Sequence, residues 1–176
     1  LSAMLHQKEV TYNNLYRSFI QYCERIDKPL HLCGLSLGGI LALNYAIDYP
    51  EKVESLVLLG TQYSMPKLLL KLQNIVFRFL PKTSFHELGF KKSDFIQLTN
   101  SMLHLNFTSD LINISCATLI VCGEKDYANK KAAKALVERI PKAKLQLIPN
   151  AGHEVNIQAP QKLAQTLETF YKTHHL

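Results

Sequence analysis

The chain has 176 residues, with 47% hydrophobic and 19% charged side chains and a formal net charge of +6. This composition is typical of a folded globular domain and excludes an intrinsically disordered chain. No window approaches the roughly 18 consecutive apolar residues that a membrane-spanning helix needs, so stable membrane insertion is not expected. The Lys and Arg residues are scattered along the chain, so a nucleic-acid partner is not expected either.

Four short apolar runs predict β-strands. They are LHLCG, VESLVLLG, ATLIVCG and AKLQLIPN, at residues 30–34, 53–60, 117–123 and 143–150. Most of them are apolar at successive positions, which is typical of strands that are covered on both faces. We therefore expect most of these strands to be central rather than solvent-facing.

Helices are predicted before, between and after these strands. Apolar spacing and stop signals place them at residues 11–27, 37–50, 128–141 and 157–173. Pro29 and Pro50 end the first two helices, and Pro160 lies in the first turn of the last one. Strands that alternate with helices predict an α/β fold, with a parallel sheet joined by right-handed crossovers.

Residues 62–110 interrupt this alternation between the second and third predicted strands. They lack strand character and predict two or three helices, so we interpret them as a helical cap inserted into a core of residues 1–61 and 111–176. Within the insertion, MPKLLLKLQNIVFRFLP at 65–81 is apolar around most of a helix. It either lines a pocket, which would favour a small hydrophobic substrate, or packs against neighbouring helices.

One serine lies in an unusual setting, between the first predicted strand and the helix that follows it. Gly34-Leu35-Ser36-Leu37-Gly38 matches the pattern G-x-S-x-G. In a tight strand-to-helix turn the Ser36 hydroxyl would be exposed, and a side chain at Gly34 or Gly38 would collide with neighbouring backbone. The Leu37 N–H, at the positive end of the helix, could then stabilise an oxyanion. The alternative is that Ser36 is simply a helix N-cap.

Two further polar residues follow the third and fourth predicted strands. Asp126 lies in VCGEKDYANKK and His153 lies in LIPNAGHEV. Taken alone, Asp126 could be a helix cap or turn residue, and His153 could be an ordinary loop histidine. Because carboxyl ends of parallel strands share one edge of a sheet, however, we expect Ser36, Asp126 and His153 to converge there. A serine needs a base to become a nucleophile, and the base needs a carboxylate to orient it.

The chain resembles the α/β-hydrolase superfamily in the motifs GLSLGG, YPEKVESLVLLG, TLIVCGEKD and IPNAGHEVNIQAPQKLAQTLETF. It looks most like the branch of small bacterial esterases, enol-lactonases and haloperoxidase-like proteins. The resemblance implies an α/β-hydrolase fold in which Ser36 is the nucleophile, His153 the general base and then acid, and Asp126 the orienting carboxylate. It also implies that residues 62–110 cover the active site.

The sequence departs from the family pattern in its N-terminal part. The family's sheet has about eight strands, whereas four are predicted here, and no H-G-x-x segment for a second oxyanion donor is visible. Because the chain begins with Leu1, we expect it to be part of a longer protein. The strand at 30–34 would then be an exposed edge, open to self-association.

The sequence therefore predicts a serine hydrolase that cleaves an ester or lactone of a small hydrophobic substrate through an acyl-enzyme. Two alternatives remain open: a C–C hydrolase or perhydrolase with the same triad, and a ligand-binding or signalling protein with little turnover. No cofactor or metal is expected, since His86 and His104 lack partners at ligand spacing. Cys33 and Cys122 are predicted to be buried in strands, which suits a reducing, cytoplasmic location. The four cysteines, which form no C-x-x-C pair, are Cys23, Cys33, Cys116 and Cys122.

Overall fold

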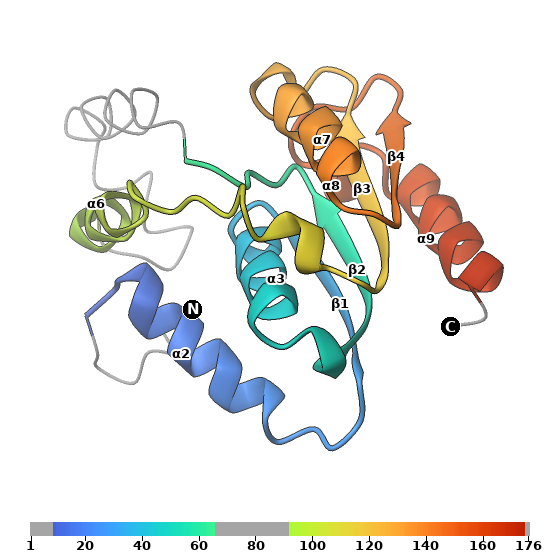
Figure 1. The fold of residues 1–176 in the computed structure, drawn as a ribbon. Coiled ribbons are helices and arrows are strands. Elements are labelled where there is room, and N and C mark those ends of the chain that lie inside the picture. The colour runs from blue at the N-terminus through green and yellow to red at the C-terminus, as the bar shows by residue number, and fades with distance from the viewer. Residues whose placement is uncertain (1–8, 66–91, 175–176) are drawn as a thin grey trace. The chain divides into compact units, whose positions relative to one another are not determined.

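The computed structural model describes residues 9–65 and 92–174 (Figure 1). These residues form two compact units. The described residues of Leu1–Ile26 and Ser64–Asn106 make up the first unit, and those of Asp27–Tyr63 and Phe107–Leu176 make up the second.

A four-stranded parallel sheet forms the centre of the second unit. The strands are β1 (Leu30–Leu35), β2 (Val53–Leu59), β3 (Ala117–Gly123) and β4 (Ala143–Ile148), and they lie side by side in that order. All four predicted strands and the α/β fold are confirmed. The register pairs the last residue of β1 with the last residue of β2, and the last residue of β3 with that of β4. The loops that follow the strands therefore leave from one edge of the sheet.

Helices pack on this sheet because the side chains of its two central strands, β2 and β3, are apolar and buried almost throughout. α3 (Leu37–Asp48) contacts β1 and β2, while α7 (Tyr127–Arg139) contacts β3 and β4. α9 (Pro160–His174) contributes Leu163 and Phe170 to an apolar cluster with alternate residues of β2 and β3, such as Val57 and Val121. In Figure 1 the strands lie between α3 and α9. Two short 3-10 helices, η1 (Pro50–Lys52) and η2 (Leu111–Asn113), lie in the connections.

The C-terminal helical segment differs from the prediction. The single helix expected over 157–173 is instead α8 (Val155–Gln158) followed by α9. Ala159 separates the two, with φ −145° and ψ 54°. The ring of Pro160 disfavours the helical conformation in the residue before it, so Pro160 begins a new helix. Pro160 does lie in the first turn of the last helix, as predicted.

β1 is more exposed than its apolar sequence suggested. The thiol of Cys122 in β3 is buried as expected, but Cys33 in β1 is exposed, so that prediction was wrong. The reason is the place of β1 in the sheet: among the described strands it pairs with β2 alone, so its side chains have neighbours on one side only. Self-association through this edge stays a prediction.

The first unit consists of two described helices and a short strand-like contact. Thr11 caps α2 (Tyr12–Cys23) by accepting a hydrogen bond from the Asn14 N–H. The Tyr12 N–H donates to Ser101 Oγ at 2.8 Å and so joins α2 to α6 (Lys92–Ser101). A β-bridge pairs Ser64 with Asn106. The helix predicted over 11–27 is therefore present, although it ends at Cys23.

Much of the predicted cap cannot be compared with the structure. Residues 66–91, which include His86 and nearly all of the apolar stretch 65–81, lie outside the described residues. The division into a core and a cap at 62–110 stays a prediction. Within the described ranges, no helix is both long enough and apolar enough to cross a membrane.

The different burial of two cysteines gives a test of the fold. Burial and the charge of Asp126 raise the pKa of the Cys122 thiol to about 11, so its thiolate fraction at pH 7 is on the order of one in ten thousand. We expect iodoacetamide to modify Cys33 in the folded protein and to modify Cys122 only after unfolding. Mass spectrometry of tryptic peptides, with Cys33→Ser as the control, measures this. Equal modification of both thiols in the folded chain would contradict the sheet order described above.

Candidate functional site

Ser36 lies in the turn between β1 and α3, in a backbone conformation that is uncommon for a residue with a side chain. Its φ is 53° and its ψ is −114°. Its N–H donates to the Leu59 carbonyl at the end of β2 at 2.8 Å, and its own carbonyl accepts from the Ile40 N–H at 3.0 Å. The Ser36 hydroxyl makes no capping hydrogen bond, so helix capping does not account for this serine. Strain of this kind costs about 1–3 kcal/mol and is found mostly at functional sites.

The glycines around Ser36 agree with the prediction at Gly34 but not at Gly38. A Cβ at Gly34 would overlap the backbone of Gly38 and Gly39, so the prediction for Gly34 is confirmed. At Gly38 an added Cβ would meet nothing within 4 Å, so that part of the prediction was wrong. The glycine required by packing is Gly39, where a Cβ would overlap the side chain of Thr61. The second close approach is therefore between α3 and the loop after β2.

The first turn of α3 directs backbone N–H groups to the space beside Ser36. Leu37 is the first residue of the helix, so its N–H has no acceptor within the helix. The positive end of the helix dipole lies at the same place. Leu37 thus lies where the sequence analysis expected an oxyanion donor.

Asp126 and His153 are joined by a hydrogen bond. The His153 Nδ1–H donates to Asp126 Oδ2 at 2.9 Å. The Asp126 side chain is almost completely buried, at 4% exposure, while that of His153 is 41% exposed. A carboxylate only accepts hydrogen bonds, so Nδ1 must carry the proton and Nε2 is left free to accept one.

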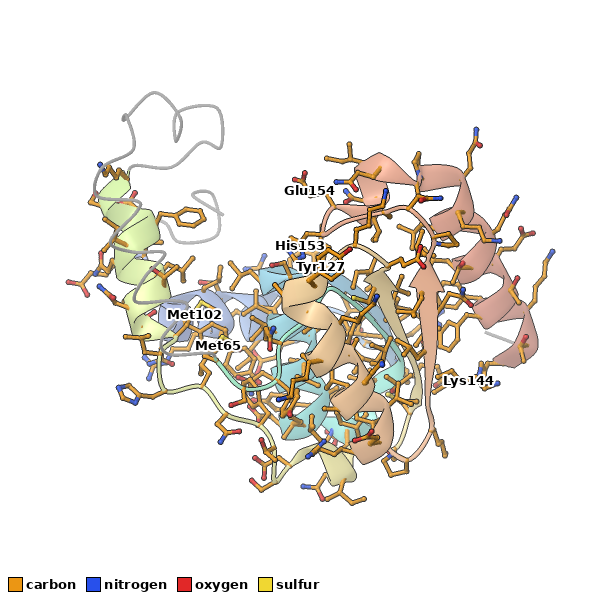
Figure 2. All side chains as sticks on the ribbon, turned by 90° about the horizontal axis from the view of Figure 1, so that it is seen from above. Met65, Met102, Tyr127, Lys144, His153 and Glu154 are labelled. Carbon is orange, nitrogen blue, oxygen red and sulfur yellow. The ribbon has the colours of Figure 1, made fainter. Side chains whose placement is uncertain are left out.

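Asp126 is also the N-cap of α7, because its side chain accepts a hydrogen bond from the Asn129 N–H. Asp126 therefore caps α7 and pairs with His153 at the same time, although these two roles were predicted as alternatives. His153 lies in the loop between β4 and α8, and Figure 2 labels it together with Glu154, the N-cap of α8, and Tyr127, the first residue of α7.

Backbone contacts between two loops bring Asp126 and His153 together. The Lys125 N–H donates to the Ala151 carbonyl at 2.8 Å. At the end of β3, a Cβ on Gly123 would overlap the Gly152 carbonyl, so only glycine allows the loops to approach this closely. These contacts therefore fix the loop after β3 against the loop after β4, close in the chain to Asp126 and His153.

Gly60, which the sequence analysis did not single out, lies against this pair. It follows β2 with φ +52°, and its N–H donates to the Val121 carbonyl at 2.9 Å. A Cβ at Gly60 would lie 2.9 Å from His153 Nδ1 and 3.2 Å from Asp126 Oδ2. In the sequence, Gly60 is marked only as a glycine at the end of a predicted strand. That position does not indicate that Asp126 and His153 pack against it.

Ser36 is linked to the Asp126–His153 pair through the end of β2. Leu59 accepts the Ser36 N–H, and the next residue, Gly60, packs against the imidazole of His153. No hydrogen bond joins Ser36 Oγ to His153 in the part of the chain that the structure describes. Among the same residues, no group of three or more His, Cys, Asp or Glu side chains could hold a metal ion.

The sequence matches the Alpha/beta hydrolase family over residues 7–166. The chain belongs to this family. It is 23% identical to monoacylglycerol lipase ABHD6 of Mus musculus in an alignment that covers 89% of this chain and 59% of the relative. It is 26% identical to the alpha/beta hydrolase domain-containing protein VTE7 of Arabidopsis thaliana, covering 82% of this chain and 54% of that protein. The chain thus spans less than two thirds of the length of these relatives.

Solved structures support the same fold. The enol-lactonase from Burkholderia xenovorans superposes with a TM-score of 0.80 at 15% identity, covering 92% of this chain and 73% of that one. An esterase from Exiguobacterium antarcticum gives 0.79 at 19% identity, covering 94% and 75%. The resemblance stated from the sequence is confirmed by these likenesses and by the family match.

The contact of Gly60 with the imidazole predicts the effect of one methyl group. In Gly60→Ala we expect the Asp126–His153 hydrogen bond to break, because the half-exposed imidazole can turn away from the new Cβ. The free energy of unfolding should fall by about 1–2 kcal/mol, the cost of a side chain in the left-handed region. The Nδ1–H proton resonance of His153, assigned by its absence in His153→Ala, should disappear, and urea titration gives the stability.

The matched control is Gly38→Ala, because an added Cβ there meets nothing within 4 Å. That variant should keep the Nδ1–H resonance. A Gly60→Ala protein with an unchanged resonance would show that this contact is not as close as described.

Proposed function

We propose that this chain carries the catalytic residues of a serine hydrolase that cleaves carboxylic esters or lactones of small hydrophobic molecules. The observation that carries the proposal is the 2.9 Å hydrogen bond from His153 Nδ1 to the buried Asp126. It leaves Nε2 of an oriented, partly exposed imidazole available as a base. The ring packs against Gly60, which follows the Leu59 whose carbonyl accepts the Ser36 N–H. Membership of the α/β-hydrolase family supports the same reaction class.

In the proposed reaction His153 Nε2 takes the Ser36 hydroxyl proton as Oγ attacks the substrate carbonyl carbon. The Leu37 N–H donates to the oxyanion of the tetrahedral intermediate. The intermediate collapses to an acyl-enzyme, and His153 gives its proton to the departing alkoxide. Water then attacks the acyl carbon and gives a proton to His153. As the bond from the acyl carbon to Oγ breaks, His153 returns that proton to Ser36 Oγ, which releases the acid and restores Ser36.

One observation favours a second candidate, a ligand-binding or signalling protein with little turnover. No hydrogen bond joins Ser36 Oγ to His153 within the described residues. Such bonds are often long in unliganded hydrolases and shorten when substrate binds, so we rank this candidate second. The two differ in whether Ser36 is activated toward electrophiles.

A fluorophosphonate probe tests the proposal, since only an activated serine reacts quickly with it. We expect the wild-type chain to be labelled and Ser36→Ala to remain unlabelled. Hydrolysis of a short p-nitrophenyl ester should fall by at least about 10³-fold in Ser36→Ala and by about 10⁴-fold in Asp126→Asn. The control is Ser109→Ala, an exposed serine in a turn, which should behave like wild type.

Labelling that persists in Ser36→Ala would show that a different residue reacts. A folded intact protein that neither labels nor hydrolyses the ester would favour the ligand-binding candidate instead.

A further inference from the structure

We propose that Asn129 is a positioning residue for the Asp126–His153 pair and that Gln62 holds Asn129 in place. The proposal rests on the function proposed above and adds two residues to its machinery. Both lie in the second unit, with Gln62 in the loop after β2 and Asn129 in the first turn of α7. Neither follows from the G-x-S-x-G pattern or from the order of the three predicted site residues.

The Asn129 side chain contacts both oxygens of the buried carboxylate. Its Nδ2 donates to Asp126 Oδ1 and Oδ2, each at 2.9 Å, and lies 3.1 Å from His153 Nδ1. Asn129 itself is buried, at 8% exposure. The amide therefore holds the carboxylate through two hydrogen bonds, whereas its approach to His153 Nδ1 joins two donors and is a contact rather than a third hydrogen bond.

Gln62 determines which way the Asn129 amide points. Gln62 Nε2 lies 3.1 Å from the Ala128 carbonyl oxygen and 2.9 Å from Asn129 Oδ1. A backbone carbonyl only accepts, so the Gln62 group that faces it must be the NH2. That NH2 then requires an acceptor on Asn129, which turns Oδ1 toward Gln62 and Nδ2 toward Asp126. The reverse orientation would place an amide oxygen against two carboxylate oxygens.

These contacts hold the carboxylate at both of its oxygens. Oδ1 accepts from the Asn129 N–H and Nδ2, while Oδ2 accepts from Nδ2 and from His153 Nδ1–H. A carboxylate bound in this way cannot rotate about its side-chain bond without losing donors while it is buried, which is costly. Asn129 thus keeps Oδ2 directed at Nδ1, and the imidazole keeps its tautomer.

A purely structural role for Asn129 would act through the cap of α7, and this can be separated from positioning. The capping bond to Asp126 comes from the backbone N–H of Asn129, which any residue except proline would supply. Replacing the side chain therefore leaves that bond possible and removes only the amide. Asn129→Leu, which is similar in size and has no donor, is the test variant.

We expect Asn129→Leu to lower kcat for p-nitrophenyl ester hydrolysis by about 10²-fold, which is the usual effect of a misplaced catalytic group. KM should change by less than about threefold. In the Asp126→Asn background the same substitution should lower kcat by less than about threefold, because Asn129 acts on the imidazole by positioning the Asp126 carboxylate. Lys131→Ala, an exposed position on the same helix, should match wild type.

Gln62→Leu provides a second variant should Asn129→Leu not fold. It leaves the Asn129 amide in place but free to rotate, so kcat should fall in the same direction by a smaller factor. Thermal unfolding of each variant is recorded alongside. The proposal would be overturned if both variants kept the wild-type kcat. It would also be overturned if Asn129→Leu lowered kcat by the same factor in the Asp126→Asn background as in the wild type.

The Nδ1–H resonance of His153 separates this proposal from the proposed function. We expect the resonance to be lost or broadened in Asn129→Leu and retained in Lys131→Ala, whether or not the chain hydrolyses esters. An inactive intact protein with this NMR result would remove the hydrolase proposal and keep the positioning role. An unchanged resonance in Asn129→Leu would remove the positioning role alone.

Discussion

The site depends on one buried carboxylate. A charge removed from water is costly unless hydrogen bonds compensate it, and Asp126, with 4% of its side chain exposed, receives them from His153 and Asn129. The donors that satisfy the carboxylate also orient the imidazole. The requirement for a satisfied buried charge and the requirement for an oriented base are therefore met by the same contacts.

The sheet supports this arrangement by close approaches of backbone at its carboxyl edge. Four contacts there are closer than a Cβ would allow in the native arrangement: Gly34 with the start of α3, Gly39 with Thr61, Gly123 with the loop after β4, and Gly60 with His153. Each draws two loops or elements closer than a Cβ would permit. Parallel pairing sets the ends of the strands level, and these glycines then determine how near the functional side chains come to each other.

The differences from the sequence predictions have physical causes at particular residues. Gly38 and Gly39 are adjacent and equally small, but only Gly39 meets Thr61, which no local pattern reveals. Cys33 lies in an apolar run that resembles a central strand, yet β1 is paired on one side only among the described strands. Pro160 was recognised as a first-turn residue, but its effect on Ala159 was strong enough to divide the expected helix.

The sequence by itself determined the α/β alternation, the four strands and the strand-to-helix turn at Ser36, because these follow from local periodicity, glycine spacing and proline positions. It also placed Asp126 and His153 at one edge of the sheet, since parallel strands present their carboxyl ends together. Only the tertiary structure decided that these two side chains bond at 2.9 Å, that Gly60 lies against them, and that Gln62 orients Asn129. Those contacts join residues that lie 27 (Asp126 and His153), 67 (Gln62 and Asn129) and 93 (Gly60 and His153) positions apart, and local sequence carries no information about atoms that meet across such separations.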